Sequence, residues 1–368
     1  MTKPIKKLLS SYGETMGMGD ENFKEHHSMI LFEDGTLDVF GSNSYDQLQI
    51  SKWSSLYSSS DKVSLIDIAC GNSHSLCLTN TGDIIGCGNA RDGRLGIPKS
   101  GKEVSKPTKI PSFLSDSEDL VIRIFCFSNE SFALTKKGLV YGWGKNFKNE
   151  LALSHSSSVS SPTLISFPLH DNEVIVQLCP FFALSSTGRI FHWSSQKKIH
   201  ALSLPFPSDS SERVVSIASG LLHCLALTNK HSVLSFGSNP YGQLGCSSSS
   251  SLSKFSVISF SLSSSSEFVV QIDASSHFSL ALTNLGRVFS WGTPSFSSVS
   301  LKVPTLLPSF SPPLSSSSSL LHLSCGDYHS LFSSNLHHVY VYGSNSDRQL
   351  LNCSNDPIDP PSLLDKYS

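Results

Sequence analysis

The chain has 368 residues, of which 27 are Lys or Arg and 29 are Asp or Glu, so its net charge at pH 7 is −2. This balance excludes a general electrostatic attraction to nucleic acid or membranes. No apolar run approaches the roughly 20 residues that cross a bilayer, and the apolar stretch at the start is too short for a secretory signal. We expect a soluble, monomeric protein of the cytoplasm, with the nucleus as a second location.

One feature recurs along the chain about every fifty residues. An aromatic residue or cysteine, followed by a small residue, ends a short apolar run. In chain order these pairs are Phe40-Gly41, Cys87-Gly88, Trp143-Gly144, Trp193-Ser194, Phe236-Gly237, Trp291-Gly292 and Tyr342-Gly343, in steps of 47, 56, 50, 43, 55 and 51 residues. A period of this length is typical of one supersecondary unit copied around or along an axis.

Two turns keep a constant register within each repeat. Six residues before the small residue is a turn position, occupied in order by Gly35, Gly82, Gly138, Gly188, His231, Gly286 and His337. Fourteen residues before it another turn ends, at His27, His74, Glu130, Pro180, His223, Phe278 and His329. Glycine adopts the positive φ of a tight hairpin turn without steric cost. Histidine is among the other residues enriched there, so we expect strained but tolerated turns at His231 and His337.

The segments around these turns predict strands in every repeat. In the fifth, residues 214–217 lead to the run 223–228, which lacks polar alternation and is typical of a strand buried on both faces. Residues 233–237 then predict a second strand of hairpin length. The first repeat shows no clear strand directly before His27, and the fourth, 174–194, lacks the Gly-x-x-His turn. Length variation falls in serine-rich stretches between repeats, at 58–60, 156–158, 247–251, 263–266 and 315–319.

Strand pairs that are buried on both faces need neighbours, and fifty residues suffice for a four-stranded sheet. We therefore predict an all-β fold, a seven-bladed β-propeller with four-stranded blades of about fifty residues. Helical solenoids are excluded because proline and glycine interrupt every unit and no 3.6-residue period runs for ten residues. The propeller is predicted over 26–353, and the end segments 1–25 and 354–368 are candidates for closing the ring.

Several segments resemble the repeat of the regulator of chromosome condensation family. They are 68–76 with 79–82, 236–239 with 241–245, and 325–331. The match extends over roughly 26–353, and it is specific because position, order and copy number agree together. The resemblance implies a seven-bladed propeller and, as one activity, guanine-nucleotide exchange on the small GTPase Ran.

The nine cysteines favour neither a metal site nor a disulfide framework. Cys70, Cys126 and Cys325 share one register, at which Ser219 and Ala274 stand in other repeats. Such interchange indicates a close-packed site for a small side chain. No Cys-x-x-Cys pair occurs, and the odd count disfavours a complete set of disulfides. We expect no metal and no cofactor.

The motifs also favour a protein that is not an enzyme. A phosphate-binding loop would need lysine where Arg94 follows 88–93, and Gly-x-Ser-x-Gly is absent. A catalytic site needs unlike groups that converge on one reacting atom, whereas the histidines of this chain recur at equivalent positions. We therefore expect structural roles for the repeated residues His74, His223, His329, Trp143, Trp193 and Trp291.

Recognition by loops is the remaining possibility, since the turns of a propeller gather on two faces. The turns just before the repeated histidine supply the predicted partner-binding residues, which are Asn72, Asn129, Glu130, Leu221, Leu222, His277, Asp327 and Tyr328. Leu221, Leu222 and Tyr328 are favoured, because exposed apolar and aromatic groups contribute most binding energy. The alternative is that the two leucines pack beneath a neighbouring loop.

Two function classes follow. The founding exchange factor of the resembled family uses acidic and histidine side chains in these turns, together with a wedge-like hairpin. Here the matched turns hold Glu130, Asp327 and few other acids, and the candidate wedge, 97–120, shows no clear hairpin turn. We favour a non-enzymatic adaptor that binds a protein partner, with a Ran exchange factor as the alternative.

A narrower resemblance concerns three short segments. Residues 84–89, 126–129 and 141–146 are similar to parts of the small fungal propellers linked to diphthamide synthesis and Elongator-dependent tRNA modification. This resemblance implies one particular partner, a small metal-binding electron carrier.

Overall fold

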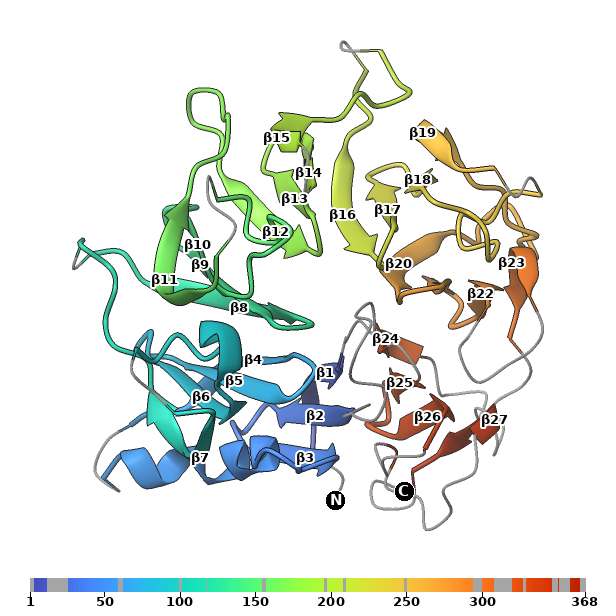
Figure 1. Cartoon of the computed structure of the whole chain (residues 1–368). Helices are drawn as coiled ribbons and strands as arrows, with labels where there is room; N and C mark the ends of the chain where they lie inside the picture. The colour runs from blue at the N-terminus through green and yellow to red at the C-terminus, as the bar shows by residue number, and fades with distance from the viewer. Residues whose placement is uncertain are drawn as a thin grey trace.

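The protein is a ring of seven antiparallel β-sheets around a central channel, as the computed structural model shows (Figure 1). The described residues are 3–11, 26–58, 62–98, 101–116, 118–153, 157–194, 197–207, 210–247, 250–293, 300–307, 320–326, 329–345, 350 and 358–364. The predicted all-β seven-bladed propeller is confirmed. Within these residues no helix has the length and apolar character to cross a membrane.

Consecutive strands form each blade, and successive blades follow the chain order. Blade 1 holds β1 (Ile5–Ser10), β2 (His27–Phe32) and β3 (Leu37–Gly41), and blade 2 holds β4 (Leu65–Cys70), β5 (His74–Thr79), β6 (Ile84–Asn89) and β7 (Glu103–Lys109). Blade 3 holds β8 (Val121–Phe127), β9 (Glu130–Thr135), β10 (Val140–Gly144) and β11 (Val159–Ile165), and blade 4 holds β12 (Ile175–Cys179), β13 (Phe182–Ser185), β14 (Ile190–Ser194) and β15 (Lys197–Ala201).

The remaining three blades repeat this arrangement. Blade 5 holds β16 (Val214–Ser219), β17 (His223–Thr228), β18 (Val233–Gly237) and β19 (Leu252–Val257), and blade 6 holds β20 (Val269–Ala274), β21 (Phe278–Thr283), β22 (Val288–Gly292) and β23 (Leu301–Leu306). Blade 7 holds β24 (Leu320–Cys325), β25 (His329–Ser334), β26 (Val339–Gly343) and β27 (Ile358–Leu363). The first strand of each blade lies nearest the channel (Figure 1).

Blade 1 departs from the predicted four strands. Its sheet has three strands among the described residues, and the 3-10 helix η1 (Gln47–Leu56) follows β3 and packs against it. A second, short 3-10 helix, η2 (Arg91–Gly93), lies in the loop after β6. Blade 4, which lacks the Gly-x-x-His turn, still forms a complete four-stranded sheet.

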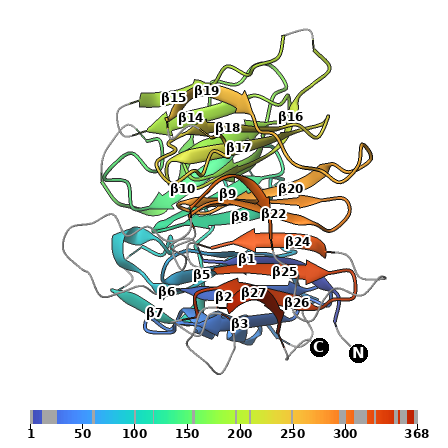
Figure 2. The same ribbon diagram turned by 90° about the vertical axis from the view of Figure 1, so that its right-hand side faces the viewer.

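The two ends of the chain meet at the joint between blades 7 and 1. The strand that the sequence does not show directly before His27 is β1, which packs against β24 and β25 (Figures 1 and 2). The backbone N–H of Ser10 donates a hydrogen bond to Ser324 Oγ at 3.1 Å. Blade 1 thus contains only N-terminal strands and blade 7 only C-terminal strands, so packing between blades joins the ends of the ring.

Aromatic side chains fill the spaces between blades. Trp143, Trp193 and Trp291 are each at most 1% exposed. In three joints a phenylalanine from the connection before the blade lies against the tryptophan, with ring centroids 6.3 Å apart for Phe113–Trp143, 6.0 Å for Phe167–Trp193 and 5.6 Å for Phe260–Trp291. Each blade therefore covers the apolar face of the next, as strands buried on both sides require.

The predicted hairpin turns adopt the left-handed conformation. All five glycines of that register have positive φ, and so do His231 (φ 64°) and His337 (φ 63°), which confirms the strained turns expected there. The His231 ring stacks on Phe268 at a centroid distance of 4.0 Å, and this contact offsets part of the cost of the turn.

Candidate partner-binding face

Two sets of loops share one face of the ring, which we call the histidine face. They are the turns that join the first and second strands of a blade and the loops that follow the third strands. The two sets are bonded to each other, since Asn89 donates its N–H to Ser73 O at 2.8 Å and Ser238 donates to Leu222 O at 2.8 Å. The turns between second and third strands lie at the opposite ends of these strands, on what we call the hairpin face.

Each repeated histidine bonds a serine of the following blade. The Nε2–Oγ distances are 2.8 Å for His27–Ser75, 2.9 Å for His74–Ser131, 2.9 Å for His223–Ser279 and 2.8 Å for His329–Ser28. Ser131 and Ser279 in turn donate to backbone carbonyls, at 2.7 Å and 3.0 Å. A hydroxyl that donates its proton elsewhere must accept from the ring, so Nε2 carries the proton in these histidines.

The glycine of the Gly-x-x-His motif makes room for the histidine ring. A Cβ at Gly71 would lie 2.6 Å from His74 Nδ1, and one at Gly220 would lie 2.7 Å from His223 Nδ1. Burial lowers the pKa of His223 to about 3, with a smaller contribution from His277, and burial moves the pKa of His74 well below its usual value. These rings are therefore neutral at physiological pH and bond blade to blade.

Three joints lack the histidine, and at two of them the following blade also lacks the serine. The position holds Glu130, Pro180 or Phe278, and the serine acceptor is also absent at the first two joints, where Phe181 and Cys224 stand. Glu130 is 7% exposed. Burial, and then the neighbouring Glu150 carboxylate, raise its pKa well above the usual range. The side chain of this predicted contact residue therefore lies mostly within the ring.

A buried arginine fastens blade 2 to blade 3. Arg94 is 5% exposed and donates from Nη1 to Asn129 Oδ1 at 2.6 Å and to Ser73 Oγ at 3.2 Å. Its Nη2 pairs with Asp92 Oδ2 at 3.2 Å. The carboxamide oxygen of Asn129, another predicted contact residue, is thus engaged within the protein. Asn72 is half-buried, and its backbone N–H donates to Ser128 O at 2.8 Å.

Blades 5 and 6 together present an exposed apolar surface on this face, separate from the exposed Phe147 on the loop after β10 of blade 3. Leu222 is 53% exposed and Tyr241 is 44% exposed, whereas Leu221 is only 8% exposed. The Tyr241 ring meets His277 edge-on at a centroid distance of 4.3 Å, which bridges the two blades. Tyr241 is held in place because its backbone N–H donates to Gln243 Oε1 at 3.0 Å. We call Leu222, Tyr241 and His277 the blade 5/6 patch.

The structure divides the predicted contact residues into two groups. Asn72, Asn129 and Glu130 lie on blades 2 and 3, and Leu222 and His277 lie on blades 5 and 6. Asp327 and Tyr328 fall outside the described residues. Sequence reasoning did not select Tyr241, although its Tyr-Gly-Gln-Leu loop was part of the family resemblance and is the signal that could have found it.

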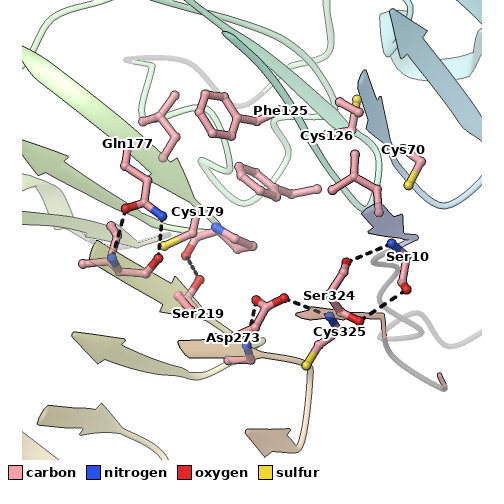
Figure 3. Close-up of a pocket in the computed structure, with 18 of the residues that line it drawn as sticks. Ser10, Cys70, Phe125, Cys126, Gln177, Cys179, Ser219, Asp273, Ser324 and Cys325 are labelled. Carbon is pink, nitrogen blue, oxygen red and sulfur yellow. Dashed lines mark hydrogen bonds between the residues drawn. The ribbon is translucent and has the colours of Figure 1, made fainter. Parts of the chain in front are cut away.

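The central channel is a cavity of about 280 Å³ lined by the inner strands (Figure 3). Cys70, Cys126 and Cys325 occupy the predicted common register and line it. Burial raises the pKa of Cys70 to about 12, so its thiol stays protonated. Among the described residues no group of histidine, cysteine and acidic side chains is arranged to hold a metal ion.

Polar groups of the channel wall join neighbouring blades. Gln177 donates to Ile217 O at 2.7 Å and accepts from the same residue's N–H at 3.0 Å, and Asp273 accepts from Cys325 N–H at 2.8 Å (Figure 3). Desolvation in the narrow channel raises the pKa of Asp273 to about 6. These bonds hold the ring together, so the exposed loops are the better candidates for recognition.

The comparisons with known proteins agree with this architecture. Residues 56–366 match the family model described as the RCC1-like domain. This chain belongs to the RCC1-like domain family. The match covers blades 2 to 7, and blade 1 completes the ring in the structure.

The relatives of this RCC1-like chain are longer than the segment that matches it. It is 29% identical over 291 residues to human "Probable E3 ubiquitin-protein ligase HERC6", covering 73% of this chain and 28% of that protein. It is 26% identical over 254 residues to the mouse "RCC1-like G exchanging factor-like protein", covering 63% and 54%. The chain therefore spans less than two thirds of the length of either relative.

Solved structures show the same fold at lower identity. Human WBSCR16 superposes with a TM-score of 0.71 at 20% identity, covering 84% of each chain. Yeast RCC1 (Prp20) bound to Kap60 gives 0.70 at 22% identity, covering 88% of this chain and 82% of that one. At these identities the likeness establishes the propeller alone.

Proposed function

We propose that this RCC1-like propeller is a non-enzymatic adaptor that binds a protein partner through the blade 5/6 patch. The observation that carries the proposal is that blade 5 exposes both Leu222 and Tyr241 on this face, with the Tyr241 ring fixed against His277 of blade 6 at a centroid distance of 4.3 Å. Aromatic and aliphatic anchors held in fixed positions lose little conformational entropy on binding. Solved relatives support protein binding, since yeast RCC1 is described bound to Kap60 and with binding properties to Gsp1p and histones.

Affinity purification of the full chain tests this proposal. We expect the double variant Leu222→Asp, Tyr241→Ala to recover at least tenfold less of the partner than the wild type, because a buried aspartate and a lost ring remove the centre of the interface. The matched control is Val257→Asp, whose side chain is 64% exposed on β19 at the outer edge of the same blade. Equal recovery by the double variant would place the interface elsewhere, and no stable partner with the wild type would remove the adaptor proposal.

The proposal also concerns which protein the partner is. The small metal-binding electron carrier and Ran are the two candidates from the resemblances. Quantitative mass spectrometry of the purified complex, followed by a binding titration with each purified candidate, distinguishes them. Recovery of neither would leave the adaptor proposal with a different protein partner.

Guanine-nucleotide exchange is the second candidate function. The mouse relative named an exchanging factor-like protein favours it, whereas the burial of Glu130 removes one acidic group from the face. Under the adaptor proposal, the release of labelled GDP from Ran keeps its intrinsic rate when micromolar propeller is added. An acceleration of tenfold or more would establish exchange instead.

A further inference from the structure

Four blades carry an acidic residue two positions before their innermost strand, on the hairpin face. These residues are Asp119, Glu173, Glu212 and Glu267. In blades 4 and 6 an arginine from the hairpin of the same blade neutralises the acid, with Nη1–Oε2 distances of 2.6 Å for Arg189–Glu173 and 2.6 Å for Arg287–Glu267. The chain therefore shows twice how a guanidinium is bound at this position.

An aromatic ring completes both of these internal sites. Arg189 Cζ lies 4.8 Å from the centroid of Phe191, and Arg287 Cζ lies 5.2 Å from that of Phe289. The guanidinium is thus held between a carboxylate and a ring face, the two groups that planar cations prefer.

Blade 3 has the acid and the ring but not the arginine. Leu139 stands at the position of Arg189 and Arg287, and Tyr141 stands at the position of the phenylalanines. Desolvation and then the charge of Asp119 raise the pKa of Tyr141, and Phe113 of the connection lies against the Tyr141 ring at a centroid distance of 4.8 Å. Leu139 is 40% exposed and offers no donor.

Asp119 has one carboxylate oxygen without a hydrogen-bond donor among the described residues. The residue is 3% exposed, and its Oδ1 accepts the backbone N–H groups of Leu120 at 3.0 Å and Lys137 at 3.1 Å. Its Oδ2 is buried and has no hydrogen-bond partner within the described chain. Leaving a buried carboxylate oxygen unbonded is costly, so the site is suited to an external donor.

A cavity of about 350 Å³ adjoins this carboxylate. It lies between the hairpin turn of blade 2 and the connection to blade 3, and Asp83, Phe113, Asp116 and Asp119 are among its lining residues. Asp83 pairs with Lys109 at 3.1 Å, and Asp116 pairs with Lys137. Asp119 forms no ion pair of its own among the described residues, and the cavity volume is at the lower end of the range of ligand pockets.

We propose that this cavity binds an arginine side chain of a partner protein, whose guanidinium donates to Asp119 Oδ2 and packs against Phe113, the aromatic residue among the lining residues. The bound arginine supplies to Asp119 the charge that Arg189 and Arg287 supply to the acids of blades 4 and 6. The carboxylates of the lining are not grouped in a way that would hold a metal ion among the described residues, whereas a planar, multiply donating cation matches one carboxylate beside rings. The site is on the hairpin face, so it does not depend on the blade 5/6 patch.

Titration of the full chain with blocked tripeptides tests the proposal. The probes are acetyl-Gly-Arg-Gly-amide, acetyl-Gly-Lys-Gly-amide and acetyl-Gly-Gln-Gly-amide, and the readout is the NMR shift of the Leu120 and Lys137 amides, which donate to Asp119. We expect saturable shifts with the arginine peptide, at least fivefold tighter than with the lysine peptide, and none with the glutamine peptide. Equal affinity for lysine would overturn the arginine preference, and unmoved amides at saturating probe would overturn the site.

Two variants separate binding from folding. Asp119→Asn should abolish the shifts, while the control Asp171→Asn at an exposed position should leave them unchanged. Leu139→Arg rebuilds the internal site of blades 4 and 6, so we expect it to block the arginine peptide and to raise the melting temperature. A Leu139→Arg protein that melts no higher and still binds the peptide would contradict the proposal.

Discussion

Replacing Trp291 by alanine is expected to lower the free energy of unfolding by about 3–5 kcal/mol. The side chain is fully buried and packs against Phe260, with ring centroids 5.6 Å apart. Its Nε1–H donates to Gln243 O at 2.8 Å across the joint between blades 5 and 6. The substitution removes the aromatic contacts and the inter-blade bond together and leaves a cavity that rigid strands cannot close.

Urea denaturation followed by circular dichroism measures this loss. Phe147→Ala is the matched control, because Phe147 is 54% exposed on the loop after β10 and should cost less than about 1 kcal/mol. Coincident denaturation curves for the Trp291 variant and the wild type would show that the blades do not depend on this packing.

The fold could be predicted because its repeated positions are determined by local chemistry. A turn that needs positive φ selects glycine, and a histidine ring lying against the preceding turn selects the glycine of Gly-x-x-His. Such requirements select the same residue type at the same position in most of the repeats. The strand β1 was missed because 16 residues separate it from His27, although Ile5 to Ser10 keeps the register of Leu65 to Cys70.

The binding face was less predictable, because exposure depends on which neighbour covers a loop. Leu221 and Leu222 are adjacent and chemically identical, yet one is 8% and the other 53% exposed. Glu130 was predicted as a contact residue from its place in a loop, yet its side chain is only 7% exposed. Three histidines pair with a serine 48 to 57 residues later, and His329 pairs with Ser28 where the ring closes. This pairing could be read from the sequence, since histidine and serine are both absent at two joints.

Acid is expected to destabilise this protein below about pH 6.5, because its buried histidine rings are neutral in the folded state. Burial lowers the pKa of His27 and His223 to about 3 and that of His74 and His329 well below 6.5. In the unfolded chain these side chains titrate near 6.5. Between about pH 3 and 6.5 the unfolded state therefore binds four more protons at these positions, and stability falls as the pH falls.

Two buried carboxyl groups act in the opposite direction. Desolvation raises the pKa of Asp273 to about 6, and burial raises that of Glu130 well above its usual value. Below about pH 6 Asp273 holds a proton in the folded state that the unfolded chain takes up only near pH 4, and the raised pKa of Glu130 acts in the same direction. The buried histidines outnumber these two carboxyls, so unfolding takes up protons between pH 6 and 5 and stability falls by about 1.4 kcal/mol per pH unit for each net proton taken up.

The pH dependence of the unfolding equilibrium in urea tests this account and identifies its source. His223→Gln should reduce the slope of the logarithm of the unfolding constant against pH by about one, because it removes one of the four neutral rings while Gln retains a donor for Ser279. His170→Gln, at an exposed position on the connection to blade 4, should leave the slope unchanged. A wild-type stability that stays constant from pH 7 to 5 would mean that the rings accept protons in the folded state, and would contradict the proposal that burial keeps them neutral.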